Sequence, residues 1–294
     1  MREAKHVQVL GTPFSEVVSF GDSLSDNGFI NGHGFRRYTN TWTWVEYLSQ
    51  LLGLHNDNWA FGGAMSDERN QAHPPGVNWS GLAWQVREYL AGVNGADISR
   101  VLFTVMGGSN DFWGGQLSGE VSAQNLRLAM DALVAAGARH ILFRETSAVL
   151  LAPGYLSGAW AGGGAGWKKL VDETNDVTRR IIGRDLPAEH PQVSLHYIST
   201  DSLFTKIKNG EPGYRFEILD KFWLGSYDFP HPYKYLWWDE WHPMGTLHLM
   251  MAEEALAALR ETLALGGAGR LPDGLEGLGA QIPATGEGPL ARNG

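Results

Sequence analysis

The stretch Glu16-Val17-Val18-Ser19-Phe20-Gly21-Asp22-Ser23-Leu24 joins an apolar run to a small polar segment. Its apolar residues predict a first β-strand over residues 16–20. Ser23 follows directly, and at the end of a strand in an α/β sheet side chains project into a crevice rather than into a core. A serine hydroxyl is a weak nucleophile that needs a neighbouring base. The segment therefore predicts the first strand of the fold and a candidate nucleophile beside it.

Further apolar, β-rich runs alternate with helical patterns along the chain. We predict strands at 58–61, 101–105, 141–144 and 193–198, and helices at 42–52, 82–93, 121–136, 167–186 and 244–265. This alternation predicts an α/β fold with a mostly parallel, doubly wound sheet that helices cover on both faces. Residues 151–166 are rich in Gly and Ala and are expected to form a long loop. One domain is predicted over 1–265, and a Gly- and Pro-rich tail over 266–294 is expected to be flexible.

Composition excludes several classes of function. The chain has 294 residues and a net charge of −9, which argues against a nucleic-acid binder because such proteins carry basic stripes. It contains no cysteine, so disulfides and thiolate chemistry are excluded. No apolar stretch is long enough for an integral membrane segment, and the first ten residues lack the pattern of a signal peptide. We expect a soluble protein, exported or periplasmic if a signal was trimmed and otherwise cytoplasmic, whose oligomeric state the sequence leaves open.

Three other segments carry groups suited to acyl transfer. Asp239-Glu240-Trp241-His242 supplies a histidine base and an acid that can orient it. The paired glycines within Asn58-Trp59-Ala60-Phe61-Gly62-Gly63-Ala64 let backbone N–H groups approach a ligand closely. Gly108-Ser109-Asn110-Asp111 supplies an amide donor, and such donors stabilise the oxyanion of a tetrahedral intermediate. Because the carboxyl ends of parallel strands line one crevice, these distant segments can converge on Ser23.

In this order the four segments resemble the sequence blocks of the GDSL, or SGNH, hydrolase family. Gly21 to Gly28 is similar to the nucleophile block of the bacterial phospholipase, hemolysin and choline-esterase-like branches. The resemblance runs from about Gly21 to His242 and implies a flavodoxin-like three-layer α/β/α sandwich. It implies that Ser23 is the nucleophile, that His242 is the general acid/base and that Asp239 orients the histidine. It also implies an oxyanion hole formed by the backbone N–H of Ser23 together with Gly63 and Asn110.

The sequence thus predicts a serine esterase that uses neither a metal nor a cofactor. Its substrate is expected to be a small-molecule, short-chain carboxylic ester, with acetyl esters of choline or sugars as candidates. Aromatic residues beside the blocks (Trp241, Phe112 and Trp113) are candidates for substrate binding, since aromatic faces attract a quaternary ammonium or stack on a sugar. Two alternatives stay open: a phospholipase A or lipid acyltransferase with the same triad, and a non-catalytic sugar- or cation-binding protein.

Overall fold

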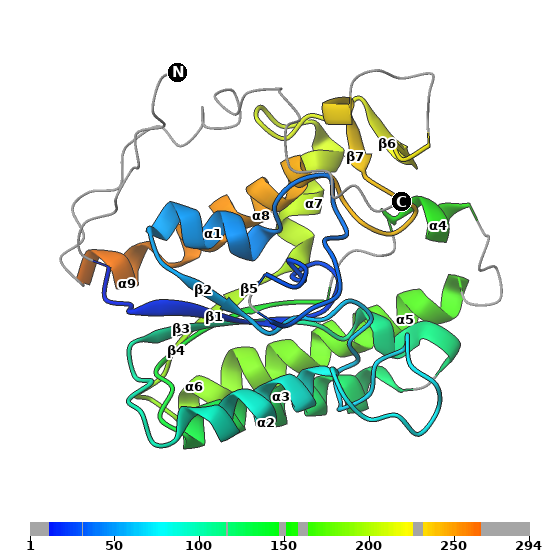
Figure 1. Ribbon diagram of the computed structural model, residues 1–294. Coiled ribbons are helices and arrows are strands. Elements are labelled where there is room, and N and C mark those ends of the chain that lie inside the picture. Colours follow the sequence, from blue (N-terminus) through cyan, green and yellow to red (C-terminus); the bar gives the residue numbers. More distant parts are fainter. Residues whose placement is uncertain are drawn as a thin grey trace.

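Five parallel strands form the central sheet of the protein (Figure 1). The computed structural model describes residues 12–30, 32–115, 117–146, 151–157, 164–225 and 232–265, so the predicted tail over 266–294 lies outside the described residues. The strand order is β2-β1-β3-β4-β5. The strands are β1 (Glu16–Gly21), β2 (Asn56–Asn58), β3 (Val101–Met106), β4 (His140–Arg144) and β5 (Ser194–Ile198). Neighbouring strands pair in parallel throughout.

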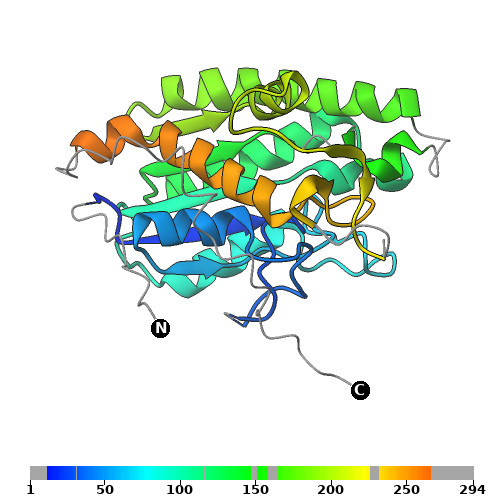
Figure 2. The ribbon, with the colours of Figure 1, turned by 90° about the horizontal axis from the view of Figure 1, so that it is seen from above.

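Helices cover both faces of this sheet, which confirms the predicted doubly wound α/β sandwich. One face carries α1 (Trp44–Leu52), α7 (Thr200–Asn209), α8 (Gly245–Ala258) and α9 (Arg260–Leu265). Figure 2 shows α1 and α8 side by side over the sheet, and the two helices pack together. The other face carries α2 (Leu82–Val93), α3 (Gly119–Ala135), α5 (Gly164–Thr178), the π-helical turn η3 (Arg179–Asp185) and α6 (Leu186–Glu189). Each face therefore has its own apolar core.

The strand order has a switch point between β1 and β3. The chain leaves β1 through α1 on one face and enters β3 through α2 on the other, so the connections diverge at this point. Ligands of open α/β sheets bind outside the carboxyl ends of the strands at such a switch point. Ser23 follows β1, and Asn110 lies in the 3₁₀ helix η1 (Ser109–Gly115) that follows β3. The topology thus brings two of the four sequence blocks to one place.

Several predicted elements differ from the observed ones. The second strand is Asn56–Asn58 rather than 58–61, because the polar edge strand gains its pairing from β1 and not from its own apolar residues. Part of the predicted loop at 151–166 is helical, as α4 (Pro153–Leu156) and the start of α5 fall within it. The predicted helix at 244–265 is divided into α8 and α9. We did not predict α7, β6 (Ile218–Phe222), η4 (Pro232–Lys234) or β7 (Tyr235–Trp237).

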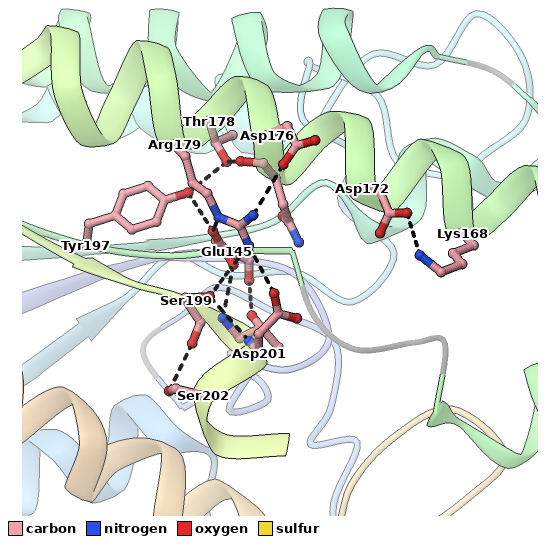
Figure 3. Close-up of polar contacts among 12 residues, drawn as sticks. Glu145, Lys168, Asp172, Asp176, Thr178, Arg179, Tyr197, Ser199, Asp201 and Ser202 are labelled. Carbon is pink, nitrogen blue, oxygen red and sulfur yellow. Dashed lines mark hydrogen bonds and ion pairs between the residues drawn. The ribbon is translucent and has the colours of Figure 1, made fainter. Parts of the chain in front are cut away.

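A buried carboxylate at the end of β4 ties several elements together (Figure 3). The Glu145 side chain is fully buried and forms an ion pair with Arg179, whose Nε lies 2.6 Å from Oε1. The Tyr197 hydroxyl donates to Oε1 at 2.9 Å, and the Ser199 hydroxyl donates to Oε2 at 2.9 Å. The backbone N–H of Thr200 also donates to Oε2, at 3.1 Å. Glu145 therefore links β4 with η3, β5 and the start of α7.

Candidate active site

A tight turn after β1 presents the Ser23 hydroxyl. Within this turn the backbone N–H groups of Ser25 and Asp26 both donate to the Asp22 carbonyl, at 3.0 and 2.9 Å. The N–H of Leu24 donates to the Asp22 carboxylate at 3.0 Å. Asp22 itself is buried, and this burial raises its pKa to about 6. The backbone bonds fix Ser23 at the end of the strand while its side chain stays partly exposed.

The Ser23 hydroxyl contacts the histidine of the fourth block. His242 Nε2 lies 2.9 Å from Ser23 Oγ, although 219 positions separate the two residues in the chain. On the other side of the ring, Nδ1 lies 2.8 Å from Asp239 Oδ1 and 2.9 Å from Oδ2. The structure therefore brings together all three side chains of the predicted triad, with the imidazole between the hydroxyl and the carboxylate.

Local backbone bonds hold Asp239 in place for this contact. Its Oδ1 accepts the N–H groups of Trp241 at 2.9 Å and of His242 at 2.8 Å, which requires the D-x-x-H spacing. Burial would raise the pKa of Asp239, but the hydrogen bond with His242, its charge and these two N–H groups together lower it. The carboxylate stays ionised at neutral pH and can stabilise a protonated imidazole.

The backbone N–H groups of Gly62 and Gly63 have different surroundings. Gly62 N–H donates to Asp26 Oδ2 at 2.7 Å, so it is used inside the protein. In the part of the chain that the structure describes, the N–H groups of Ser23 and Gly63 have no acceptor. Asn110 Nδ2 donates to the Ala64 carbonyl at 3.0 Å, which places this amide beside the glycine segment. Of the two glycines, Gly63 is thus the one whose N–H remains available to a ligand.

Gly63 could not be replaced by a larger residue without strain. Its φ is +80°, a conformation that side chains with a Cβ rarely adopt. An added Cβ would lie 2.5 Å from Asn70 Oδ1. Asn70 cannot easily move, because its amide donates to the Gly62 carbonyl at 2.9 Å and its Oδ1 accepts the N–H of Ala72 at 2.9 Å. The surrounding bonds therefore fix the direction of the Gly63 peptide.

Tyr38 is a residue of the site that the sequence did not reveal. Its ring centroid lies 4.9 Å from that of His242, at an interplanar angle of 38°. The ring also covers Gly62, where an added Cβ would collide with it. The Arg36 guanidinium lies 4.7 Å above the Tyr38 ring. The one sequence signal for this contact is the glycine pair, since a glycine lets another group approach the backbone closely. No motif marks Tyr38 itself.

The predicted aromatic residues occupy two different environments. Trp241 contacts Trp113 edge to face, with ring centroids 4.7 Å apart, and its centroid lies 5.8 Å from that of Trp167, so the chain neighbour of His242 belongs to a cluster of three tryptophans. Trp241 and Trp113 are partly exposed. Phe112, in contrast, is 1% exposed and packs in a buried cluster with Trp167. The 3₁₀ turn of η1 places Phe112 in this buried cluster, and its role in substrate binding stays a prediction.

Within the described ranges, no three His, Cys, Asp or Glu side chains gather closely enough to hold a metal ion. None of the helices in those ranges is both long and apolar enough to cross a membrane. The reactive groups that do come together are a hydroxyl, an imidazole and a carboxylate. This set, on an α/β/α sandwich, is typical of a serine hydrolase.

The comparisons identify the family. The model of the GDSL-like lipase/acylhydrolase family matches residues 17–255. The chain belongs to this family, which confirms the predicted resemblance. A member of the lipolytic G-D-S-L family from Veillonella parvula has a similar fold. Its TM-score is 0.50 at 16% sequence identity, and the match covers 82% of this chain and 96% of that one.

Two further similarities are more distant or shorter. A putative arylesterase from Agrobacterium tumefaciens matches with a TM-score of 0.49 and 16% identity, over 85% of this chain and all of its own. The thermolabile hemolysin of Vibrio parahaemolyticus is 31% identical over 112 residues, which are 33% of this chain. The match covers 25% of the hemolysin, so this chain corresponds to about a quarter of that relative.

Proposed function

We propose that the protein hydrolyses short-chain carboxylic esters through an acyl-enzyme formed on Ser23. The observation that carries the proposal is the contact of His242 with Ser23 Oγ at 2.9 Å and with Asp239 at 2.8 Å. In the first step Ser23 Oγ attacks the ester carbonyl while His242 Nε2 takes the hydroxyl proton. Asp239 holds the ring through Nδ1 and stabilises the imidazolium.

The tetrahedral intermediate then needs donors for its oxyanion. In the proposed mechanism these are the N–H groups of Ser23 and Gly63 and the second amide hydrogen of Asn110. Removal of one such donor in comparable sites costs about 3–4 kcal/mol of transition-state stabilisation. His242 next gives its proton to the leaving alcohol, and the C–O bond of the ester breaks. Water then attacks the acyl-enzyme while His242 takes one of its protons. The bond between the acyl carbon and Ser23 Oγ breaks, His242 gives the proton to Ser23 Oγ, and the acid leaves.

The alcohol half of the substrate is a finer part of the proposal. Acetyl esters of choline or of sugars are candidates, because Trp241, the chain neighbour of His242, and Trp113, which contacts Trp241, are both partly exposed. Aromatic faces hold a quaternary ammonium with about 0.5–2 kcal/mol and also stack on sugar rings. Acetylthiocholine and acetylated xylan test these candidates against neutral acetyl esters. Equal rates on all of them would remove the role assigned to the tryptophans.

The deciding experiment measures hydrolysis of 4-nitrophenyl acetate and 4-nitrophenyl palmitate by wild type and Ser23→Ala. We expect preference for the acetate, and a loss of about 10³- to 10⁶-fold in kcat/KM on removal of the Ser23 hydroxyl. Ser15→Ala is the control, since the Ser15 hydroxyl contacts the Arg100 carbonyl away from the site. Retention of most activity in Ser23→Ala contradicts the mechanism. Faster hydrolysis of 4-nitrophenyl palmitate than of the acetate would instead favour a phospholipase or lipid acyltransferase.

A further inference from the structure

Three of the four backbone polar groups of Gly62 and Gly63 have a partner inside the protein. The Gly62 N–H donates to Asp26 Oδ2 at 2.7 Å, and the Gly63 carbonyl accepts the N–H of Gln71 at 2.9 Å. The Gly62 carbonyl accepts a hydrogen bond from Asn70 Nδ2 at 2.9 Å. The fourth group, the Gly63 N–H, has no acceptor among the described residues, which leaves it for a ligand or for solvent.

We propose that Asn70 is a positioning residue that aims the Gly63 N–H at the oxyanion formed on the ester. The inference rests on the proposed acyl-enzyme at Ser23 and adds a residue that lies outside the four sequence blocks. The Gly62 carbonyl and the Gly63 N–H belong to one peptide unit, which is planar and almost always trans, so the two bonds point in opposite directions. Because Asn70 holds the carbonyl on one side, the N–H is directed to the other.

The glycine segment lies between two groups of the site. On one flank the Tyr38 ring covers Gly62, and its centroid lies 4.9 Å from that of the His242 ring. On the other flank Asn110 Nδ2 donates to the Ala64 carbonyl at 3.0 Å. The segment therefore runs from the surroundings of the base to the amide of the third block, which is where the proposed mechanism needs a donor for the oxyanion.

Each polar atom of the Asn70 amide has a partner, so the donor cannot turn away from Gly62. Asn70 is 3% exposed, and its Oδ1 accepts the backbone N–H of Ala72 at 2.9 Å. Since that N–H can only donate, the amide nitrogen faces the Gly62 carbonyl and Ser80 Oγ, which lies 3.1 Å from Nδ2. Ser80 is fully buried and has a φ of +64°, a strained conformation of the kind that clusters at functional sites. This strain maintains the second partner of the Asn70 amide.

The bond from Asn70 also strengthens the donor that it aims. A carbonyl that accepts a hydrogen bond polarises its own peptide unit, so the Gly63 N–H becomes a better donor. The oxyanion carries its full charge only after attack on the carbonyl carbon. Asn70 should therefore stabilise the transition state more than the bound ester, and its loss should lower kcat/KM rather than stability alone.

Three alanine variants separate this role from a general effect on the fold. Asn70→Ala removes the bond to the Gly62 carbonyl. Ser80→Ala removes the other partner of the same amide and leaves the Gly62 bond in place. Asn175→Ala is the matched control, since Asn175 is also buried but lies on α5, which packs on α3. Thermal unfolding of each variant verifies that it is folded.

The two measured quantities are kcat/KM for 4-nitrophenyl acetate and the inhibition constant of phenylboronic acid. The boron of this inhibitor bonds to Ser23 Oγ and becomes a tetrahedral anion, while His242 takes the hydroxyl proton. Its binding therefore also uses the oxyanion donors. Asn70→Ala should lower kcat/KM about 10- to 100-fold, less than the loss of a whole donor, and should weaken the inhibition in parallel. Ser80→Ala and Asn175→Ala should each change both quantities less than about threefold.

A folded Asn70→Ala variant with unchanged kcat/KM overturns the proposal. A loss of kcat/KM without weaker inhibition, or an equal loss in Ser80→Ala, overturns it as well. If Asn70→Ala does not fold, Asn70→Asp decides, because it keeps an acceptor for the Ala72 N–H while its ionised carboxylate cannot donate to Gly62. Its kcat/KM at pH 8 should be about tenfold below wild type, and a value equal to wild type overturns the proposal. Failure of the acyl-enzyme itself is recognised separately, as hydrolysis of acetate that survives Ser23→Ala.

Discussion

Asp239 and Glu145 are carboxylates with opposite surroundings. The Asp239 side chain is 25% exposed, and beyond its own turn it contacts one group, the imidazole of His242. The Glu145 side chain is 0% exposed, and its two oxygens accept bonds from an arginine, a tyrosine, a serine and a backbone N–H (Figure 3). The oxygens of Glu145 are engaged by groups that link parts of the fold, so we expect this carboxylate to stabilise the folded state. Asp239 contacts a titratable imidazole, so it can influence the protonation of that ring.

This difference separates the expected effects of mutation. Changes at the Asp239–His242 pair should alter turnover and leave the fold intact, because the backbone bonds of that turn involve few elements. Changes at Glu145 should alter the free energy of unfolding and leave turnover intact, because its partners come from η3, β5 and α7.

The largest effect is expected on removal of the base. His242→Ala should lower kcat by about 10³- to 10⁶-fold on 4-nitrophenyl acetate, since among the described residues His242 supplies the one side-chain hydrogen bond to Ser23 Oγ. Asp239→Asn should keep a kcat about 10- to 100-fold higher than that of His242→Ala, because the imidazole of His242 stays near the Ser23 hydroxyl. Thermal unfolding of both variants should remain close to wild type. The reverse ranking would indicate that another acid orients the imidazole.

A smaller effect, of another kind, is expected at Glu145. Glu145→Gln replaces an acceptor by an amide that cannot accept from all the present donors. Breaking a buried ion pair costs about 3–5 kcal/mol. The cost here should be about 2–4 kcal/mol, because the Arg179 side chain is 41% exposed and also pairs with Asp201. Urea unfolding gives this value, while kcat at low temperature should change less than twofold. A large loss of kcat in a folded variant would contradict the comparison.

Asp22 provides the smallest effect, and it depends on pH. Burial raises the pKa of this carboxyl from 3.8 to about 6, so the folded state holds its proton more tightly than the unfolded state. Its contribution to stability is complete below pH 3.8 and is lost as the pH rises through 6. Asp22→Asn should therefore gain up to about 3 kcal/mol relative to wild type between pH 4 and pH 7, since each pKa unit is worth about 1.4 kcal/mol. Urea unfolding across this range measures the gain, and parallel pH curves for the two proteins would refute it.

Local patterns made much of the fold predictable. The helix expected at 82–93 has the bounds of α2, because its apolar spacing is complete and residues in extended and left-handed conformations flank it. The strand expected at 58–61 was misplaced, since β2 is a polar edge strand whose position depends on pairing with β1. The short strands β6 and β7 pair with each other, and no periodicity can develop over so few residues.

The site divides in the same way. The sequence predicted the residues that local motifs carry, and the structure brings Ser23, Asp239 and His242 into contact. It could not predict Tyr38, whose position beside His242 depends on the path of a loop without a motif.

The distance in sequence between Ser23 and His242 has a consequence for how activity arises during biosynthesis. The serine is made first, and its base follows 219 positions later. A nascent chain on the ribosome therefore carries an inert hydroxyl while the intervening residues are synthesised. The base reaches that hydroxyl only when the last helices pack on the sheet. Under the proposed mechanism, the first turnover in a cell-free translation or a refolding mixture reports that the segment with Asp239 and His242 has packed beside Ser23.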